Sequence, residues 1–413
     1  MAKIIPFCAV RPRTDLAGRI AALPYDVYSR EEAYEAVKDD SLSFLRIDRP
    51  ETQFPADYDM YAQEVYEKAR DMLNDMIHDG AFVQEEKRAY YVYELVMNGR
   101  SQVGIAACAS VDDYENQVIK KHENTRADKE AVRIRHVDVC SAQTGPIFLA
   151  YRANAVINEV VAKTKKQDAL YDFVADDEIR HAVWKISSID DNRAIREAFN
   201  TINSIYIADG HHRAASAVKV GLKRREEHPD YTGDEEFNYF LSVLFPDDQL
   251  MIMSYNRVVK DLNGLDKEEF FNQVSKYFCI EEKGTKAFYP EQKGCFGMYL
   301  DEEWYLLSAK ETIMSDDPVD GLDVAILQDY LLTPILGIGD PRIDNRIAFI
   351  GGIRGLEELE KRADGDMKIA FSMYPTSIGE LFDVADAELL MPPKSTWFEP
   401  KLRSGLFIHK IEE

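Results

Sequence analysis

The chain has 413 residues, of which 46% are hydrophobic and 30% are charged. This length allows two or three average domains, and the composition predicts a globular protein with a packed core rather than a disordered one. Lysine and arginine total 50 against 74 aspartate and glutamate residues, which gives a net charge of −24. Such an acidic balance excludes a general nucleic-acid binder, which neutralises backbone phosphates with clustered cations.

The chain carries no signal for a membrane or for export. Its apolar stretches are well short of the roughly 20 residues that a membrane helix needs, and residues 1–6 lack the apolar core of a signal peptide. The five cysteines are an odd number, are widely spread and form no C-x-x-C pair. We therefore expect a soluble cytoplasmic protein with reduced, buried thiols and neither a disulfide framework nor a zinc ribbon.

Strand and helix patterns alternate along the first half of the chain. Ser29 and Glu32 form a capping box that opens a helix, and Asn98-Gly99 tolerates the positive φ angles of a tight hairpin turn. In chain order we expect a strand at 4–10, a capped helix at 29–37, a helix at 57–79 that ends at Gly80, a hairpin of 90–97 and 101–110, a helix up to about 140, strands at 146–151 and 204–208, and a helix at 213–220.

The second half alternates in the same way, so the fold class predicted is mixed α/β. In chain order we expect strands at 237–245 and 250–259, a helix at 267–277, strands at 295–300 and 304–307, a long amphipathic helix at 322–336, a strand at 346–350, a helix at 356–363 and a final strand at 406–408 that closes a sheet. The chain has no repeat and no Pro/Gly-rich linker, and we place the boundary of its two parts, 1–230 and 231–413, by pattern alone.

The segment 205–215 is the most informative of the chain. A buried strand leads through Gly210 into a helix that starts with His211, His212 and Arg213. Free backbone N–H groups and the helix dipole at such a turn suit an anion, and an arginine binds phosphate oxygens well, so we predict a phosphate site. The alternative is an ordinary strand-to-helix connection whose histidines bond to the backbone. A metal site is less favoured, because adjacent side chains diverge.

Residues 120–126 (Lys-Lys-His-Glu-Asn-Thr-Arg) place a carboxylate among cations in an otherwise acidic chain. Glu123 can hold Mg²⁺ or act as a base, while Lys121, Arg126 and Arg133 can neutralise a polyphosphate. The alternative is a solvated loop, since exposed ion pairs are common and weak.

Two further segments, 23–27 (Leu-Pro-Tyr-Asp-Val) and 392–396 (Pro-Pro-Lys-Ser-Thr), contain polar residues beside proline. Asp26 can activate a hydroxyl, and the Lys-Ser-Thr run can contact an anionic ligand. Both segments are equally compatible with structural turns, because proline fixes φ and Asp or Ser caps neighbouring amides. The standard P-loop, Rossmann, G-x-S-x-G and H-E-x-x-H signatures are absent from the sequence.

Together these motifs resemble the domain of unknown function family 1015, over nearly the whole chain. The matching motifs are Pro6-Phe7 with Arg11-Pro12, Leu-Pro-Tyr-Asp-Val at 23–27, His-Glu-Asn-Thr at 122–125, Ala-Asp-Gly-His-His-Arg at 208–213 and Met-Pro-Pro-Lys-Ser-Thr at 391–396.

The turn at 209–213 is also similar to the phosphate-binding turn of the ParB and sulfiredoxin superfamily and of the free serine kinases. This resemblance implies a ParB/sulfiredoxin-like nucleotide-binding core within 1–230 and a second α+β half in 231–413. Glu123-Asn124 resembles the ParB pair that meets the metal and the triphosphate, although here the pair precedes the turn. His211 stands where sulfiredoxin has its cysteine, which removes the sulfinic acid reductase reading.

The resemblance implies a nucleotide-dependent phosphotransferase that uses ATP or ADP with Mg²⁺ and acts on a small hydroxyl-bearing metabolite such as free serine. The alternatives are a nucleotide-binding regulatory switch and a binder of some other anion. The residues expected to act are Glu123, His122 and Asp26 in catalysis, Glu123 on the metal, and Asp209, Gly210, His211, His212, Arg213, Thr125, Arg126, Lys394, Ser395 and Thr396 on the nucleotide.

Overall fold

The fold of this computed structural model, which describes residues 1–412, is mixed α/β, as the sequence predicts. The chain divides into two compact units, one of residues 1–250 with 400–413 and one of residues 251–399. The division therefore falls at residue 250 rather than at the expected 230. The reason is that β12 (Tyr239–Pro246) lies inside the sheet of the first unit, between β8 and β5.

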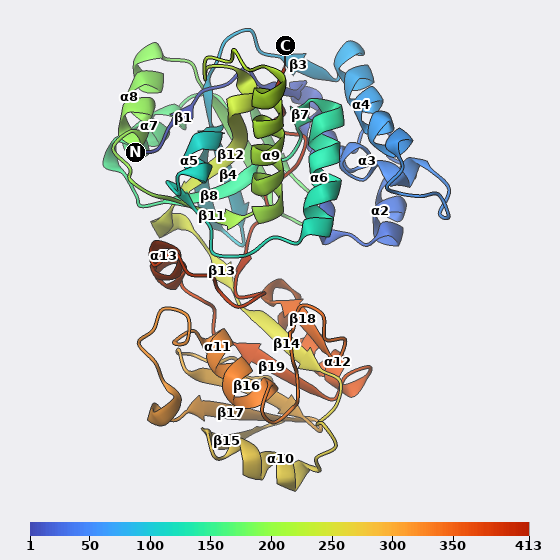
Figure 1. Cartoon of the computed structure of the whole chain (residues 1–413), viewed down its shortest axis with the longest axis vertical. Coiled ribbons are helices and arrows are strands. Elements are labelled where there is room, and N and C mark those ends of the chain that lie inside the picture. Colours follow the sequence, from blue (N-terminus) through green and yellow to red (C-terminus); the bar gives the residue numbers. More distant parts are fainter. Residues whose placement is uncertain (413) are drawn as a thin grey trace. The chain divides into compact units, whose positions relative to one another are not determined.

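The first unit is built on a nine-stranded mixed sheet (Figure 1). In pairing order its strands are β6 (Ile119–Lys120), β11 (Ile205–Asp209), β8 (Ile147–Tyr151), β12, β5 (Arg100–Ser110), β4 (Tyr90–Met97), β10 (Arg180–Ile186) and β9 (Tyr171–Val174), with β1 (Ile4–Ile5) on β5. The β11–β6 and β12–β8 pairs are parallel and the others are antiparallel. Nearly every residue of the central strands β12, β5 and β4 is buried, which matches their continuous apolar sequences.

Helices cover this sheet, and α6 and α9 pack side by side on it (Figure 1). The helices of the first unit are α1 (Ala17–Ile20), α2 (Arg30–Val37), α3 (Leu45–Asp48), α4 (Gln63–His78), α5 (Val111–Glu115), α6 (Ala127–Cys140), α7 (Ala155–Thr164), α8 (Ile189–Phe199) and α9 (His211–Glu227). Two small ribbons complete the unit, β2 (Val10–Pro12) with β3 (Phe82–Gln84) and β7 (Ala142–Gln143) with β21 (His409–Lys410). The C-terminal segment thus returns to the first unit, where Ile408 also forms a bridge with Val10.

The second unit contains a six-stranded antiparallel sheet. In pairing order its strands are β15 (Phe278–Gly284), β17 (Glu303–Ala309), β16 (Cys295–Leu300), β19 (Ile369–Met373), β14 (Tyr255–Val259) and β18 (Ile347–Gly351). Its helices are α10 (Lys267–Val274), α11 (Asp323–Leu327), α12 (Gly355–Asp364) and α13 (Ile378–Asp386), and β13 (Ile252–Met253) pairs with β20 (Trp397–Phe398).

Local sequence signals are confirmed where they involve a cap or a tight turn. The hairpin of β4 and β5 turns at Asn98 and Gly99, whose φ angles are 51° and 76°, and Ser29 caps α2 in a complete capping box. The long helix expected at 322–336 is wrong. α11 ends at Leu327 and a π-helical turn, Gln328–Leu332, follows. Pro334 lacks the N–H that a continuing helix needs, so the helix cannot run on to 336.

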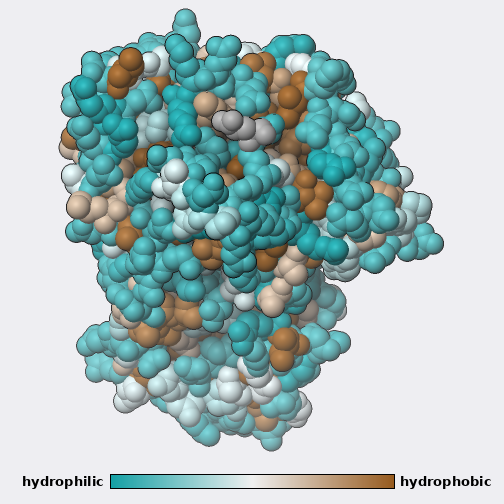
Figure 2. All heavy atoms as spheres, turned by 45° about the horizontal axis from the view of Figure 1, so that its top comes forward, coloured by the Kyte–Doolittle hydropathy of each residue, from teal (hydrophilic) through white to brown (hydrophobic). Residues whose placement is uncertain are grey.

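The hydrophilic surface agrees with what the composition predicts, whereas the burial of the cysteines agrees only in part. Figure 2 shows a face dominated by hydrophilic residues, with hydrophobic residues in separate patches. No helix within residues 1–412 is long and apolar enough to cross a membrane. The five cysteines form no disulfide in the described chain; Cys108, Cys140 and Cys295 are buried, but Cys8 is half-buried and Cys279 is exposed, so the expectation of buried thiols is wrong for Cys279.

The contact between α9 and residues 236–238 gives a first prediction. A Cβ atom at Gly221 would lie 2.5 Å from the carbonyl oxygen of Phe237 and 3.1 Å from Val111 Cγ2. We expect Gly221→Ala to lower the free energy of unfolding of the first unit by about 1–3 kcal/mol, despite the higher helix propensity of alanine. Calorimetry of the full chain measures this. Gly379→Ala, in α13, is the matched control, because a Cβ atom there would meet only Ser377 Oγ at an ordinary 3.8 Å. It must leave stability unchanged or higher; equal effects of both variants would contradict the packing argument.

Candidate functional site

The glycine turn, residues 209–213, joins β11 to α9. Gly210 has a φ of 91°, and a Cβ atom there would lie 3.1 Å from Nε of Arg213. Both the left-handed backbone and the close approach of the guanidinium therefore require glycine. The chain leaves the sheet at Asp209, whose pairing with β8 is irregular, and the next residue but one, His211, already begins the helix.

The N-terminus of α9 is open. No side chain caps it, and the N–H of Gly210 is taken by Oδ1 of Asp209 at 2.8 Å. The first N–H groups of a helix have no partner within the helix, and the dipole of this 17-residue helix places partial positive charge there. His212 is half-buried beside this end, and its carbonyl accepts a hydrogen bond from Ser216 at 2.6 Å. The helix end can thus receive an anion.

Two imidazoles meet at the turn. The rings of His122 and His211 contact each other edge to face, with centroids 4.5 Å apart and an interplanar angle of 89°. Burial lowers the pKa of His122 to about 4, and burial and the neighbouring His122 lower the pKa of His211 well below its ordinary value. Both rings are therefore neutral at pH 7, and each supplies one N–H donor and one acceptor rather than a positive charge.

The hydrogen bonds of the ring nitrogens show where a ligand can bind. His122 hydrogen-bonds to the backbone of Ile207, as the alternative of an ordinary connection expects. Nε2 of His211 is buried and has no hydrogen-bond partner within residues 1–412, and its side chain is only 8% exposed. A buried polar atom without a partner is costly, so a ligand atom at this nitrogen would remove a penalty as well as form a bond.

Glu123 lies against the same turn. Its Oε2 is 4.0 Å from Nδ1 of His211, and its side chain is 39% exposed. The structure thus brings residues 122 and 123 together with the glycine turn, although they are far apart in the sequence. The parallel pairing of β6 with β11, which sets Lys120 beside Tyr206, positions them.

The rest of the 120–126 segment forms its own contacts. Thr125 donates a hydrogen bond to Oε1 of Glu130, and Lys219 pairs with Oε2 of the same carboxylate. Arg126 is exposed and pairs with Asp128 at 2.9 Å. Thr125 therefore lies beside α9, whereas Arg126 is held by a neighbour on its own helix.

A partly buried ion-pair network supports the turn. Oδ2 of Asp209 lies 3.2 Å from Nζ of Lys401 and 3.8 Å from Nη2 of Arg213, whose Nη1 donates to the carbonyl of Pro146 at 2.8 Å. Burial alone would raise the pKa of Asp209, but Lys401 and Arg213 hold it well below its ordinary value. Arg213 is therefore a buried support of the turn, and its predicted contact with a phosphate stays a prediction. Lys401, 192 residues away, has no local motif that marks it.

A second buried pair lies close to the first. Arg133 stacks over the ring of Tyr25, 4.3 Å from its centroid, and its Nη2 is 3.7 Å from Oδ1 of Asp48, which also accepts a 2.7 Å hydrogen bond from Thr144. Asp26 is exposed, and its charge helps to raise the pKa of Arg213 against the effect of burial. The sequence analysis names Arg133 and Asp26 as candidates, but no sequence motif marks Asp48 or Thr144.

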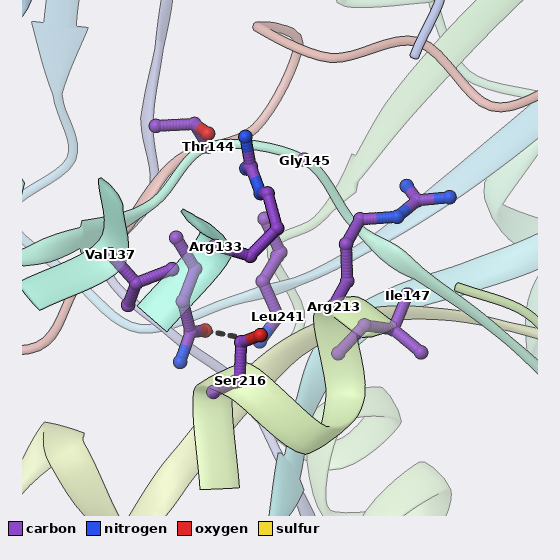
Figure 3. Close-up of a pocket in the computed structure, with 10 residues that line it drawn as sticks. Arg133, Val137, Thr144, Gly145, Ile147, Arg213, Ser216 and Leu241 are labelled. Carbon is purple, nitrogen blue, oxygen red and sulfur yellow. Dashed lines mark hydrogen bonds between the residues drawn. The ribbon is translucent and has the colours of Figure 1, made fainter. Parts of the chain in front are cut away.

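A narrow pocket lies between these two arginines (Figure 3). It holds about 290 Å³ of empty space, part of which is open to solvent. Arg133 and Arg213 extend into this region from α6 and α9, near Thr144 and Gly145, while Ile147, Leu241 and Val137 form an apolar base. The pocket thus places two guanidinium groups beside the glycine turn.

The predicted Lys-Ser-Thr run belongs to the second unit. Nζ of Lys394 is 5.6 Å from the ring centroid of Tyr255, and Ser395 donates to the carbonyl of Pro392 at 2.6 Å. Thr396 is half-buried in the same segment.

The donor set allows a magnesium ion only together with a ligand. Within residues 1–412 no group of three or more His, Cys, Asp or Glu side chains is arranged to hold a metal. Asp209 is already neutralised by Lys401 and Arg213, and Glu123 is a second, partly exposed carboxylate beside the turn. Mg²⁺ is commonly bound by one or two carboxylates with water and substrate phosphates, and this site fits that pattern.

The low pKa of His122 gives a prediction of acid sensitivity. Between pH 6.5 and 4 the unfolded chain binds a proton at His122 that the folded chain does not, so the stability falls as the pH falls. His122→Gln keeps a polar side chain without this proton. From pH 7 to pH 5 the variant should lose about 2 kcal/mol less unfolding free energy than the parent in urea titrations. His78→Gln, at an exposed position, is the control; an unchanged pH dependence in His122→Gln would refute the assignment.

Comparison with known proteins gives one match to a family model and several distant structures. The family model described as "Protein of unknown function (DUF1015)" matches residues 4–325. No curated protein matches the chain significantly. The solved structures include a free serine kinase in complex with AMP (14% identity, TM-score 0.36, covering 73% of this chain and 91% of that one). They also include a free serine kinase variant with ADP (14%, 0.37, 73% and 92%) and a conserved hypothetical protein from Pyrococcus furiosus (13%, 0.35, 73% and 94%).

The structural likeness, at these TM-scores, carries no argument about function. The family match covers more than three quarters of the chain and includes the residues of the glycine turn and of the 122–125 motif. The chain therefore belongs to the DUF1015 family.

Proposed function

We propose that the chain binds the phosphates of a nucleotide at the glycine turn and transfers a phosphoryl group to a small hydroxyl-bearing metabolite. The observation that carries this proposal is Nε2 of His211, a buried nitrogen without a partner in the described chain, beside the open N-terminus of α9. A phosphate oxygen at this position would meet backbone N–H groups, the positive end of a long helix and an imidazole.

The charges around the turn explain why a metal is part of the proposal. The charged side chains there include both signs, with Arg133, Arg213 and Lys401 near Asp48, Asp209 and Glu123. A nucleotide di- or triphosphate would thus be held mainly by directed donors, and Glu123 would hold Mg²⁺, which would supply positive charge at the phosphates.

Phosphoryl transfer asks a protein mainly for positioning and charge stabilisation. In the proposed step the acceptor hydroxyl oxygen forms a bond to the terminal phosphorus, the bond from that phosphorus to the bridging oxygen breaks, and the shortened nucleotide leaves. The hydroxyl proton passes to a carboxylate. Glu123 and Asp26 are the candidates, because Glu123 faces His211 and the charge of Asp26 acts on Arg213. Serine is the first acceptor to test, from the similarity of the turn to that of free serine kinases.

Nucleotide binding is tested on His211, because changing Arg213 would also break its bonds to Pro146 and Asp209. The parent chain should be stabilised by ADP or ATP with Mg²⁺ in a thermal-shift panel that includes CTP and GTP. His211→Ala should weaken the affinity measured by calorimetry about tenfold, since one hydrogen bond to a charged group is lost. Arg126→Ala is the control, because Arg126 is exposed and paired with Asp128. Equal affinity of the parent and His211→Ala would place the nucleotide elsewhere.

The reaction is tested with labelled nucleotide, Mg²⁺ and a panel of hydroxy amino acids, sugars and polyols. Acceptor-dependent transfer should occur in the parent, and Glu123→Gln should reduce it by roughly a hundredfold or more, since general-base and metal contacts are lost together. Asp26→Asn tests whether Asp26, rather than Glu123, takes the proton of the hydroxyl. Tight nucleotide binding without any transferred product in the parent would refute the kinase and favour a nucleotide-binding regulatory protein.

A further inference from the structure

The second unit contains a buried arginine without a counter-ion. Arg257 lies on β14, which pairs with β18 on one side and β19 on the other, and its residue is only 3% exposed. Its Nη1 donates to the carbonyl of Tyr255, and its Nη2 donates to the carbonyl of Lys394 at 3.1 Å. Both partners are neutral, so the charge of the guanidinium is not compensated by them.

Arg257 is an exception among the buried arginines of residues 1–412. The other four each pair with a carboxylate: Arg133 with Asp48, Arg213 with Asp209, Arg224 with Asp138 and Arg403 with Asp177. No ion pair within residues 1–412 includes Arg257, and no carboxylate acts on its charge there. Burial accordingly lowers the pKa of Arg257 to about 10. A buried charge without a partner destabilises a fold and is expected where an external anion completes it.

A second cation lies beside this arginine. Lys394 adopts a left-handed backbone with a φ of 61°, and its Nζ lies 5.6 Å from the ring centroid of Tyr255. The turn that presents it is fixed from both ends, because Ser395 donates to Pro392 and Thr376 donates to the carbonyl of Ser395 at 2.9 Å. Lys394 itself is exposed, so the cluster is open to solvent at this end.

Aromatic rings lie beside both cations. The guanidinium of Arg257 lies 5.4 Å from the ring centroid of Phe349, and the ring of Tyr255 packs edge to face against both Phe349 and Trp397 at 5.9 and 5.1 Å. Gly351 leaves the space for the indole, since a Cβ atom there would lie 2.7 Å from the ring of Trp397. These apolar rings lower the local dielectric constant and strengthen any bond between a guanidinium and an oxyanion.

We propose that Arg257 and Lys394 form an oxyanion site of the second unit, which takes the phosphate or carboxylate group of a small molecule. The guanidinium offers its remaining N–H donors in the fork geometry that such groups prefer, and the ammonium of Lys394 adds a mobile point charge. The alternative is a purely structural arginine that holds the turn at Lys394 through its carbonyl. That role explains two of the donors but leaves the positive charge without a counter-ion. The site does not depend on the nucleotide proposed for the glycine turn.

The three tryptophans of the chain allow a local test. The full chain is labelled with 5-fluorotryptophan and titrated with inorganic phosphate and, separately, with acetate, and Trp397→Phe assigns the ¹⁹F resonance of Trp397. This resonance should move with a saturable dependence on at least one anion, while those of Trp184 and Trp304 stay in place. Phosphate and acetate distinguish the two chemical classes of ligand.

Variants decide whether the cations are responsible. Lys394→Ala, at an exposed position, should weaken the anion affinity at least about tenfold. Lys361→Ala, 79% exposed on α12, removes the same charge at a distance and should leave the affinity unchanged. His211→Ala should retain the Trp397 response, which separates this site from the proposed nucleotide site. A Trp397 resonance that does not move with either anion, or that moves equally in Lys394→Ala, would overturn the proposal.

Discussion

The geometry of the candidate site depends on the half-buried carboxylate of Asp209. It accepts the N–H of Gly210 and pairs with Lys401 and Arg213, and Arg213 in turn holds the carbonyl of Pro146 at the edge of β8. Removing Asp209 would leave the buried charge of Arg213 without its carboxylate partner, which destabilises the turn. This network fixes the left-handed turn at Gly210, and the turn places His211 at the open helix end. The charged network therefore holds the turn in place, and Nε2 of His211 remains available for a ligand.

The sequence predicted the parts of the fold and site that short-range chemistry determines. A positive φ demands glycine at 210, an Asn-Gly pair makes the hairpin of β4 and β5, and Ser29 caps its helix, so these features follow from a few adjacent residues. The meeting of Glu123 with the glycine turn could also be predicted, because a carboxylate between cations is unusual in so acidic a chain. The long helix expected at 322–336 failed because the apolar spacing continues past Pro334, which a helix interior does not accept.

The remaining features arise from contacts between distant segments, which no local pattern records. Lys401 reaches Asp209 across 192 residues because the C-terminal segment returns to the first unit. Asp48 meets Arg133 only after α3 and α6 pack, and the neutral state of His122 and His211 follows from burial, which the sequence does not show. The missing counter-ion of Arg257 is also a long-range feature, because it can be recognised only once the positions of the carboxylates are known.

The central claim is that a phosphate oxygen binds at Nε2 of His211, and ring ¹⁵N spectra of the histidines test it most directly. The chain has eight histidines, and His211→Ala assigns the relevant signals. Addition of ADP with Mg²⁺ should shift the Nε2 resonance of His211 while the exposed His78 and His228 stay unchanged. Nucleotide binding by thermal shift together with an unmoved His211 resonance would contradict the claim.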